Sequence, residues 1–342
     1  MRIERARPLG DTTSVVSVVV PCYNYGRYLP EAVGSVLSQG VPVEIIIVDD
    51  CSTDDSAEVA SDLAEQHPQV RLVRNEHNLG HIATYNKGLG MVTGEYVVLL
   101  SADDKLASGS LRRAVSLFER HPSVGLVYGY AEPFTDVPPP VWNTGTLTVW
   151  PGSTWVDLVC HRGDNAIFNP EAIMRASLLR SLGGGYDLSF PHTADMLLWL
   201  RAGLAADLGR VNAVQGYYRT HAAQMHLTTY AGRIPDMRAR AAVYEALFGP
   251  EAAEPHAARL RWGLRSIERE AAWRAALARC AGDEDERGDY VRVAEDVSGG
   301  RLSAFLWRLD PGPRGGLGGR LVQAAYALKW NLKSRRWRWL GI

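Results

Sequence analysis

Short apolar runs that end in polar residues recur along the first 130 residues, with helical segments between them. Val15–Val20 (VVSVVV), Val43–Asp50 (VEIIIVDD) and Tyr96–Leu100 (YVVLL) are runs of this kind. Such runs are typical of strands buried on both faces. Further strands are predicted at 70–75 and 124–130, and helices at 28–40, from 52–56 to 67, 82–91 and 110–122. This alternation predicts an α/β fold with a mostly parallel central sheet flanked by helices.

Polar residues follow three of these strands. They are Pro21–Asn24 (PCYN), Asp49–Asp55 (DDCSTDD) and Ser101–Asp104 (SADD). The carboxyl ends of parallel strands share one edge, and ligands bind there. Divalent cations such as Mg²⁺ or Mn²⁺ prefer oxygen ligands and are often held by one or two carboxylates plus substrate phosphates. Asp103 and Asp104 therefore predict a cation site, whereas in the simpler alternative Asp103 caps the next helix and Asp104 is solvated.

The pattern changes after residue 130. Residues 133–163 are rich in proline and glycine and predict loops, 169–184 predict a helix after a loop, and 210–221 predict a strand followed by a loop. Residues 192–204 predict a helix, with four core positions at Met196, Leu197, Leu200 and Leu204. From Arg238 onward the chain reads as helical, and it carries one apolar stripe at Leu260, Leu264, Ile267, Ala271 and Ala275.

Composition excludes several protein classes. The chain has 342 residues, 46% hydrophobic and 22% charged, and a formal net charge of −1, which gives no electrostatic reason to expect nucleic acid as a partner. The four cysteines form no CxxC pair, so a zinc site is not expected. The charged start MRIERARPLGDTTS has no apolar core of a signal peptide, and no segment has the length of a membrane span. These features predict a cytoplasmic protein.

The end of the chain is basic and contains tryptophan. GPRGGLGGR at 312–320 predicts a flexible linker, and the segment after it includes Trp330, Trp337 and Trp339 among lysines and arginines. Two interpretations stay open. The segment either anchors the protein at the inner face of the membrane, near a lipid-linked acceptor, or packs back on the body with its charges in solvent.

Four motifs occur in a fixed order: VSVVVPCYNYGRYLPEAVGSVLSQ, VEIIIVDDCSTDDS, NEHNLGHIATYNKGL and GEYVVLLSADD. They closely resemble the family 2 glycosyltransferases. LLRSLGGGYDLSFPHTADMLLWLRAG and YYRTHAAQMH resemble the acceptor half of that family, so the resemblance covers about residues 14–226. It implies a GT-A domain at 1–232, with a nucleotide-binding half near 14–130 and an acceptor half near 131–232. A helical C-terminal region at 233–342 follows.

The resemblance implies donor-binding roles at single positions. Pro21, Tyr23 and Asn24 match the motif that packs around the nucleotide base, and an aromatic ring can stack on any base. Asp50 matches the family carboxylate that accepts a hydrogen bond from N3–H of uracil or thymine. In the alternative interpretation Asp50 caps the helix that follows.

Three more positions match the N-x-G…N motif near the ribose and pyrophosphate: Asn78, Gly80 and Asn86. The family often has an arginine where this chain has Tyr85. Without that arginine, the positive charge that compensates the pyrophosphate would come from Lys87 or the metal.

The SADD segment matches the metal motif of the family. Many members have an aspartate where Ser101 stands, while others retain only the final pair. By this match Asp104 is a direct ligand of Mn²⁺ or Mg²⁺, and Asp103 is a second ligand or holds the ribose or a metal-bound water. The family often has Arg-x-His where this chain has Arg219 and His221. His221 is then a further metal ligand and Arg219 a partner for phosphate, although a lone histidine is more often structural.

The acceptor half of the family supplies a general base. Its usual Glu-Asp pair is Ala194-Asp195 here, so Asp195 is the expected base and the usual acceptor-orienting glutamate is absent. The alternative is that Asp195 is a helix N-terminal carboxylate favoured by the macrodipole. Trp199 and Tyr186 are expected to be core residues or sugar-stacking walls.

The expected activity is inverting transfer of a single sugar from a UDP- or dTDP-sugar to a hydroxyl acceptor. The chain lacks the Q-x-x-R-W motif of the membrane-bound polymerases of the family. The acceptor is a glycan, a lipid-linked intermediate, a natural product or a protein. Two alternatives remain: a nucleotide- or carbohydrate-binding protein without activity, and a sugar nucleotidyltransferase. The first rests on Ser101 and Ala194, and the second lacks the Gly-rich phosphate loop it requires.

Overall fold

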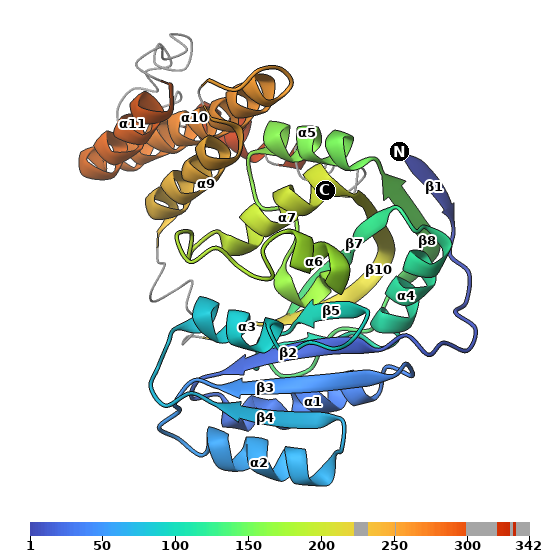
Figure 1. Cartoon of the computed structure of the whole chain (residues 1–342). Helices are drawn as coiled ribbons and strands as arrows, with labels where there is room; N and C mark the ends of the chain where they lie inside the picture. Colours follow the sequence, from blue (N-terminus) through green and yellow to red (C-terminus); the bar gives the residue numbers. More distant parts are fainter. Residues whose placement is uncertain (222–231, 250, 299–319, 329–330, 333–342) are drawn as a thin grey trace. The chain divides into compact units, whose positions relative to one another are not determined.

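The chain packs as two compact units, one made of residues 1–156 and 167–224 and the other of residues 157–166 and 225–342. The computed structural model describes residues 1–221, 232–249, 251–298, 320–328 and 331–332. Figure 1 labels the helices and strands of both units.

Four parallel strands form one side of the sheet in the first unit, in the order β5-β2-β3-β4 (Figure 1). The strands are β2 (Val16–Cys22), β3 (Val43–Asp49), β4 (Val70–Arg74) and β5 (Tyr96–Leu99). The helices between them are α1 (Leu29–Leu37), α2 (Ser56–Gln66) and α3 (His81–Leu89), and a 3-10 turn η1 (Gly26–Tyr28) precedes α1. The predicted α/β fold is confirmed. All four strands end at the same edge of the sheet.

The rest of the sheet is mixed. Helix α4 (Ser110–Arg120) leads into the long strand β7 (Val124–Phe134), which pairs in parallel with β10 (Asp207–Arg219). The strand β9 (Ile173–Arg175) lies antiparallel between β5 and β7 and joins the two parallel parts. Among the described residues the ten-stranded sheet has the order β1-β8-β10-β7-β9-β5-β2-β3-β4, with β6 (Lys105–Leu106) on β10.

Two predicted segments differ from the structure. Residues 133–163 contain the strand β8 (Asn143–Trp150) and the helix α5 (Gly152–Arg162) instead of loops, and β8 pairs with β10 and with β1 (Arg2–Arg5). Residues 169–184 are not one helix but η2 (Asn169–Glu171), β9 and α6 (Ala176–Ser181). Pairing with β5 and β7 buries Ile173 and Met174, and this tertiary gain overrides helix propensity.

Helix α7 (Ala194–Ala205) follows the prediction, with one correction. Met196, Leu197 and Leu200 are buried as expected, whereas Leu204 is 37% exposed. Leu204 lies in the last turn of the helix, so it is not the core position that the spacing predicted.

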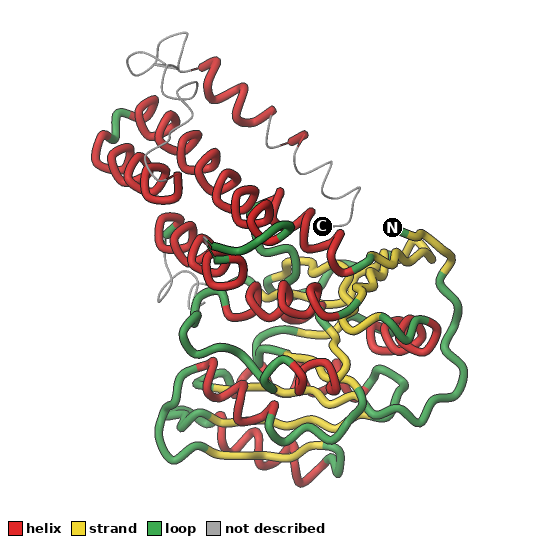
Figure 2. Tube along the Cα trace, turned by 45° about the horizontal axis from the view of Figure 1, so that its top comes forward, coloured by secondary structure: helices red, strands yellow, loops and turns green. Residues whose placement is uncertain are grey.

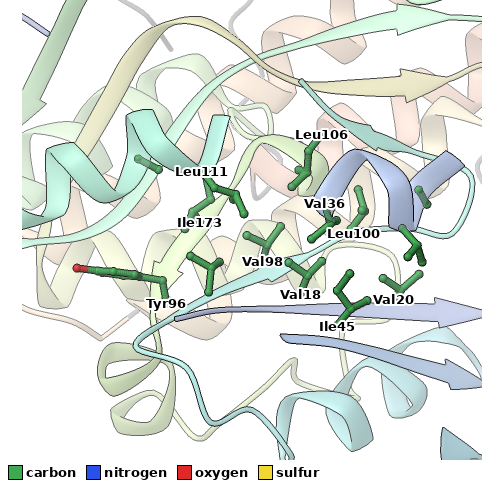
Figure 3. Close-up of a cluster of buried hydrophobic side chains, with 14 of the residues drawn as sticks. Val18, Val20, Val36, Ile45, Tyr96, Val98, Leu100, Leu106, Leu111 and Ile173 are labelled. Atoms are coloured by element: carbon green, nitrogen blue, oxygen red, sulfur yellow. The ribbon is translucent and has the colours of Figure 1, made fainter. Parts of the chain in front are cut away.

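One face of the parallel strands holds the main core (Figure 3). Val18 and Val98 from the sheet pack with Val36 of α1, Leu111 of α4 and Ile173 of β9, and all five side chains are buried. Because side chains of a strand alternate between faces, Val19 points to the opposite face. Gly88 of α3 lies against Val19 there, and a Cβ at position 88 would overlap the valine methyl group. Helix α3 therefore sits close to the sheet.

The second unit is helical in its described part and includes α9 (Arg233–Phe248), α10 (His256–Ala281) and α11 (Glu284–Ser298) (Figure 2). The helical pattern thus begins a few residues before Arg238. Residues 157–166 belong to this unit because Arg240, which is 4% exposed, binds Gly163 O and lies 3.0 Å from Asp164 Oδ1. The predicted stripe of α10 is fully buried at Ile267, Ala271 and Ala275, and partly at Leu260 and Leu264.

Within the described residues no helix has the length and apolarity needed to cross a bilayer. Residues 320–328 and 331–332 are helical. The predicted linker, except for Arg320, and Trp330, Trp337 and Trp339 lie outside the described residues. Both interpretations of the basic end therefore stay predictions.

Candidate functional site

The loops after β2 and β3 are bound to each other. Asn24, whose φ of 58° lies in the left-handed region that asparagine tolerates, accepts Thr53 N–H at its Oδ1 over 2.8 Å. Its own N–H donates to Ser52 Oγ over 3.0 Å. These bonds give Asn24 a loop-holding role. The preceding Tyr23 is 46% exposed, so its ring is open to a ligand, and Pro21 lies within β2 opposite Val48.

Asp50 is buried at the end of β3 and holds the loop before α3. Its Oδ1 accepts Leu79 N–H at 2.8 Å and Asn75 Nδ2 at 2.7 Å, and its Oδ2 accepts Gly80 N–H at 3.0 Å. Asp50 thus fastens the loop that leads into α3, rather than capping α2 as the alternative interpretation held. At the start of α2, Asp54 accepts Ser56 N–H instead.

Asn78 and Gly80 shape the same loop. Asn78 Oδ1 accepts Gly80 N–H at 3.0 Å, and Gly80 has a φ of 82°. A positive φ is easily reached only by glycine, so this turn requires Gly80. Because Gly80 is the N-cap of α3, the N–H groups of the first helical turn, which have no acceptor within a helix, point to the rim of the sheet. Such a helix end is a favourable place for phosphate.

Asn86 is directed to the main chain of Tyr186. Its Nδ2 donates to Tyr186 O over 2.8 Å, and its Oδ1 accepts Tyr186 N–H over 2.7 Å. The amide is engaged at both ends, so this geometry does not favour the predicted contact with ribose or pyrophosphate.

Asp103 and Asp104 lie in the turn after β5, and both are buried. Burial raises the pKa of Asp104 well above its ordinary value, and the neighbouring Asp103 charge raises it further. Arg219 N–H donates to Asp104 Oδ1 at 2.9 Å, and His221 Nε2 lies 3.0 Å from Asp103 Oδ2. Two adjacent carboxylates beside an imidazole form an oxygen-rich group, and a bound cation would reduce the repulsion between the two negative charges.

The carboxylate pair also meets the requirements of a metal bound jointly with substrate. In the part of the chain that the structure describes, no group of three or more His, Cys, Asp or Glu side chains is arranged to hold an ion. A magnesium-type site needs only one or two carboxylates when substrate phosphates complete the coordination. The chemistry of Asp103 and Asp104 fits that arrangement, and His221 adjoins it.

Arg219 is placed differently from its prediction as a phosphate partner. Its guanidinium is buried between the rings of Tyr28 and Phe134, 4.6 and 4.4 Å from their centroids. It donates to Asp103 O and Thr135 O, and it pairs with Glu31 Oε2 at 3.0 Å. Through these contacts Arg219 supports the turn at Asp103.

Two of the three departures from the family pattern, Tyr85 and Ser101, are in contact. Tyr85 Oη lies 3.1 Å from Ser101 Oγ, in place of the arginine and aspartate that the family often has. The pKa of the Tyr85 hydroxyl is raised by burial and by the nearby charges of Asp104 and Asp103. The neutral side chains of Tyr85 and Ser101 therefore lie next to the carboxylates of Asp103 and Asp104.

Asp195 is half-buried in the first turn of α7, where its Oδ1 accepts Met196 N–H at 2.7 Å. Burial first, and then the charges of Asp195 and Tyr85, raise the pKa of Tyr186. The rings of Tyr186 and Tyr85 meet edge to face at 5.6 Å. Tyr186 is thus a neighbour of Asp195, and Tyr85 is a neighbour of the Asp103–Asp104 turn. Tyr186 and Trp199 are buried core residues, not exposed stacking walls.

Some residues near the site were not predicted. Asn75 fastens Asp50, and Tyr25 lies at 5.5 Å from the His221 ring, edge to face. Tyr218 is a further neighbour, since burial and the Asp104 charge raise the pKa of its hydroxyl. Asn75 and Tyr218 follow the pattern of polar residues at strand ends, a signal that could have identified them.

Relatives in sequence support the resemblance. An uncharacterized glycosyltransferase of Haemophilus influenzae is 25% identical over 218 residues, which is 61% of this chain and 67% of the relative. Glycosyltransferase GlyG of Streptococcus pneumoniae is 35% identical over 124 residues, covering 35% of this chain and 41% of its own length. An uncharacterized glycosyltransferase of Nostoc is matched over 33% of this chain and 35% of its own length, at 40% identity. The matched segments thus span from about a third to two thirds of these relatives.

Solved structures share the fold. Staphylococcus aureus TarS 1–349 in complex with UDP-GlcNAc superposes with a TM-score of 0.62 at 18% identity, over 92% of both chains. Mannosyltransferase PcManGT from Pyrobaculum calidifontis, in complex with GDP-Man and Mn²⁺, gives a TM-score of 0.59 at 17% identity, over 98% of this chain and 86% of that one. This likeness confirms the GT-A fold. The model of the family described as Glycosyl transferase family 2 matches residues 17–174, so this segment is similar to that family.

Proposed function

We propose that the chain is an inverting glycosyltransferase that moves one sugar from a UDP- or dTDP-sugar to a hydroxyl acceptor. The observation that carries this proposal is the buried pair Asp103–Asp104 at the end of β5, with His221 beside it. A family 2 domain with such a pair can bind the donor and also the divalent cation whose positive charge a leaving diphosphate needs. The acceptor classes are those expected from the sequence: a glycan, a lipid-linked intermediate, a natural product or a protein.

The donor lies along the ends of β2, β3 and β5 in this proposal. Tyr23 stacks on the base, since its ring is exposed at the end of β2. Asp50 Oδ2 receives the Gly80 N–H, and a carboxylate oxygen can accept a second hydrogen bond, here from N3–H of uracil or thymine. The amino end of α3 at Gly80 faces the diphosphate, with Asn78 forming the turn that leads to it.

Asp104 and Asp103 would hold Mn²⁺ or Mg²⁺, with His221 as a further ligand. The metal, when bound, supplies a positive charge that stabilises the leaving nucleoside diphosphate. Arg219 holds this turn in place through Asp103 O and Asp104 Oδ1.

Asp195 is the proposed general base. It accepts the proton of the acceptor hydroxyl while that oxygen forms a bond with the anomeric carbon. The bond from that carbon to the diphosphate oxygen breaks on the opposite side, which inverts the configuration. The acceptor-orienting glutamate of the family is Ala194 here, and Ala194 is buried, so acceptor orientation falls to other residues.

The test of the donor is a thermal-shift screen with UDP, dTDP, GDP and CDP, each with and without Mn²⁺. A ligand that binds only the folded protein raises its melting temperature. We expect UDP or dTDP to stabilise the protein in a metal-dependent way. No shift with any nucleotide would contradict the proposal and favour a protein without activity. Release of pyrophosphate instead of nucleoside diphosphate would indicate a nucleotidyltransferase.

The test of the base is Asp195→Asn. We expect transfer to fall about 10²–10⁴-fold, the usual contribution of a positioned general base, while the nucleotide-induced thermal shift stays unchanged. Asp62→Asn, which changes an exposed carboxylate on α2, is the matched control. Normal transfer by Asp195→Asn would place the base elsewhere.

A further inference from the structure

Asn86 holds a single residue of the acceptor half from two sides. Its side-chain amide bonds both the N–H and the carbonyl of Tyr186, at 2.7 and 2.8 Å. A neighbouring strand makes the same pair of bonds, so the amide fixes both the position and the orientation of that peptide. Asn86 lies on α3, and Tyr186 is 100 positions away along the chain.

Gly185 makes this approach possible. A Cβ at position 185 would lie 2.8 Å from Asn86 Cγ and closer still to its Oδ1. The constraint is steric, because the φ of Gly185 does not lie among the positive values of Gly183 and Gly184. Any side chain at 185 therefore pushes the Asn86 amide away from the Tyr186 peptide.

Tyr186 is also fixed by its side chain. Its hydroxyl donates to Asn169 Oδ1 at 2.8 Å, and its ring packs edge to face on Tyr85, one residue before Asn86. The residue is 5% exposed. Both the main chain and the ring of Tyr186 are thus tied to neighbours, two of which are on α3.

A short hydrogen-bonded segment connects Tyr186 with Asp195. Phe190 N–H donates to Asp187 O at 3.1 Å, and Thr193 N–H donates to Phe190 O at 3.1 Å. Asp187 also pairs with Arg201 of α7 at 3.2 Å. The peptide held by Asn86 is therefore linked by successive turns to the helix that carries Asp195.

We propose that Asn86 is a positioning residue: by holding the Tyr186 peptide, it sets where the Asp195 carboxylate stands relative to the donor bound at the strand ends. This inference rests on the proposed function. It replaces the predicted contact between Asn86 and the ligand. A misplacement of about 1 Å at a reacting group can lower a rate about a hundredfold, so the expected effect is on turnover and not on donor affinity.

The experiment breaks the contact from both sides in the full chain. Asn86→Ala removes the amide, and Gly185→Ala displaces it. Asn86→Asp keeps an acceptor for Tyr186 N–H but sets a carboxylate oxygen against Tyr186 O, so it should lose activity as Asn86→Ala does. Gly90→Ala is the matched control, since its Cβ at the end of the same helix would make only ordinary contacts of 3.5 and 3.6 Å.

The activity readout is nucleoside diphosphate release from UDP-glucose, UDP-GlcNAc and dTDP-glucose with Mn²⁺ and water as acceptor. We expect kcat to fall at least tenfold in Asn86→Ala and Gly185→Ala, while the KM for the donor and the Kd for UDP change less than twofold. The double variant should be no slower than the slower single variant, because the methyl group added by Gly185→Ala collides with the Asn86 side chain. A parallel loss of UDP affinity, additive effects, or full activity of Gly185→Ala would overturn the proposal.

Hydrogen exchange supplies a readout that needs no turnover. Amide protection over residues 183–195 should fall in Asn86→Ala and Gly185→Ala and stay at the wild-type level in Gly90→Ala. Unchanged protection in both broken variants would overturn the positioning role even if activity falls. A wild-type protein that neither binds nor hydrolyses any of these nucleotides would instead contradict the proposed function, and hydrogen exchange would still report on the contact.

Discussion

Two aspartate pairs follow buried strands in this molecule, and their surroundings differ. The Asp49–Asp50 pair ends β3, where Asp50 accepts three hydrogen bonds and Asp49 lies 3.6 Å from the Arg74 guanidinium. The Asp103–Asp104 pair follows β5, where both carboxylates are buried side by side and the pKa of Asp104 is raised. The protein supplies hydrogen-bond donors to Asp50 and a cation to Asp49, whose buried carboxylate oxygens accept no hydrogen bond. The second pair has Arg219 N–H and His221 as partners but still carries repulsion between its carboxylates, which an added cation would reduce. The proposed metal site therefore lies at the second pair and not at the first.

The largest effect that would test this contrast is expected from Asp104→Asn. The variant keeps an oxygen that can accept Arg219 N–H but removes a charge from the proposed metal site. We expect at least a hundredfold loss of transfer, because charge stabilisation by a metal contributes several kcal/mol, and loss of the Mn²⁺-dependent shift with UDP. In EDTA the variant should be at least as stable as the wild type, because burial disfavours the charge that it lacks. Full metal-dependent activity would show that Asp104 is not a ligand.

Asp50→Asn should act in the opposite direction on stability. An asparagine offers only one acceptor oxygen, and its NH₂ group would face a donor among Leu79 N–H, Gly80 N–H and Asn75 Nδ2. We expect the free energy of unfolding in EDTA to fall by about 1–3 kcal/mol, the cost of leaving a buried partner unsatisfied. Urea titration measures it, with Asp62→Asn as control. A variant as stable as the wild type would remove the difference between the two pairs.

The smallest effect concerns the neutral neighbours of the second pair. Ser101→Ala removes the partner of the Tyr85 hydroxyl and should lower the free energy of unfolding by about 1 kcal/mol, with metal-dependent nucleotide binding retained. Ser101→Asp would add a third carboxylate beside Asp103 and Asp104 without an arginine to pair with it, and in EDTA it should be less stable than Ser101→Ala. Urea titration measures the stability of both variants. Equal stability would show that a charge at position 101 is not repelled by Asp103 and Asp104.

The sequence predicted the parallel strands well because their apolar runs are continuous and end at polar residues. The family resemblance also predicted that Asp103, Asp104 and His221 form one metal site. In the structure these residues lie together. β9 was missed because its three residues become a strand only through pairing with β5 and β7. The contacts of Asn86 and Arg219 could not be predicted, since they depend on residues that are 100 positions away from Asn86 and at least 84 positions away from Arg219.

The glycine at position 88 constrains any redesign of the proposed donor site. Because even a methyl group at that position would overlap Val19, the height of α3 above the sheet is fixed by packing and cannot be tuned by gradual substitution. Within the proposed donor site, substitutions are easier to accommodate at exposed positions such as Tyr23 and Leu79, which are 46% and 41% exposed. A mutational library would tolerate change there and lose nearly every member altered at Gly88.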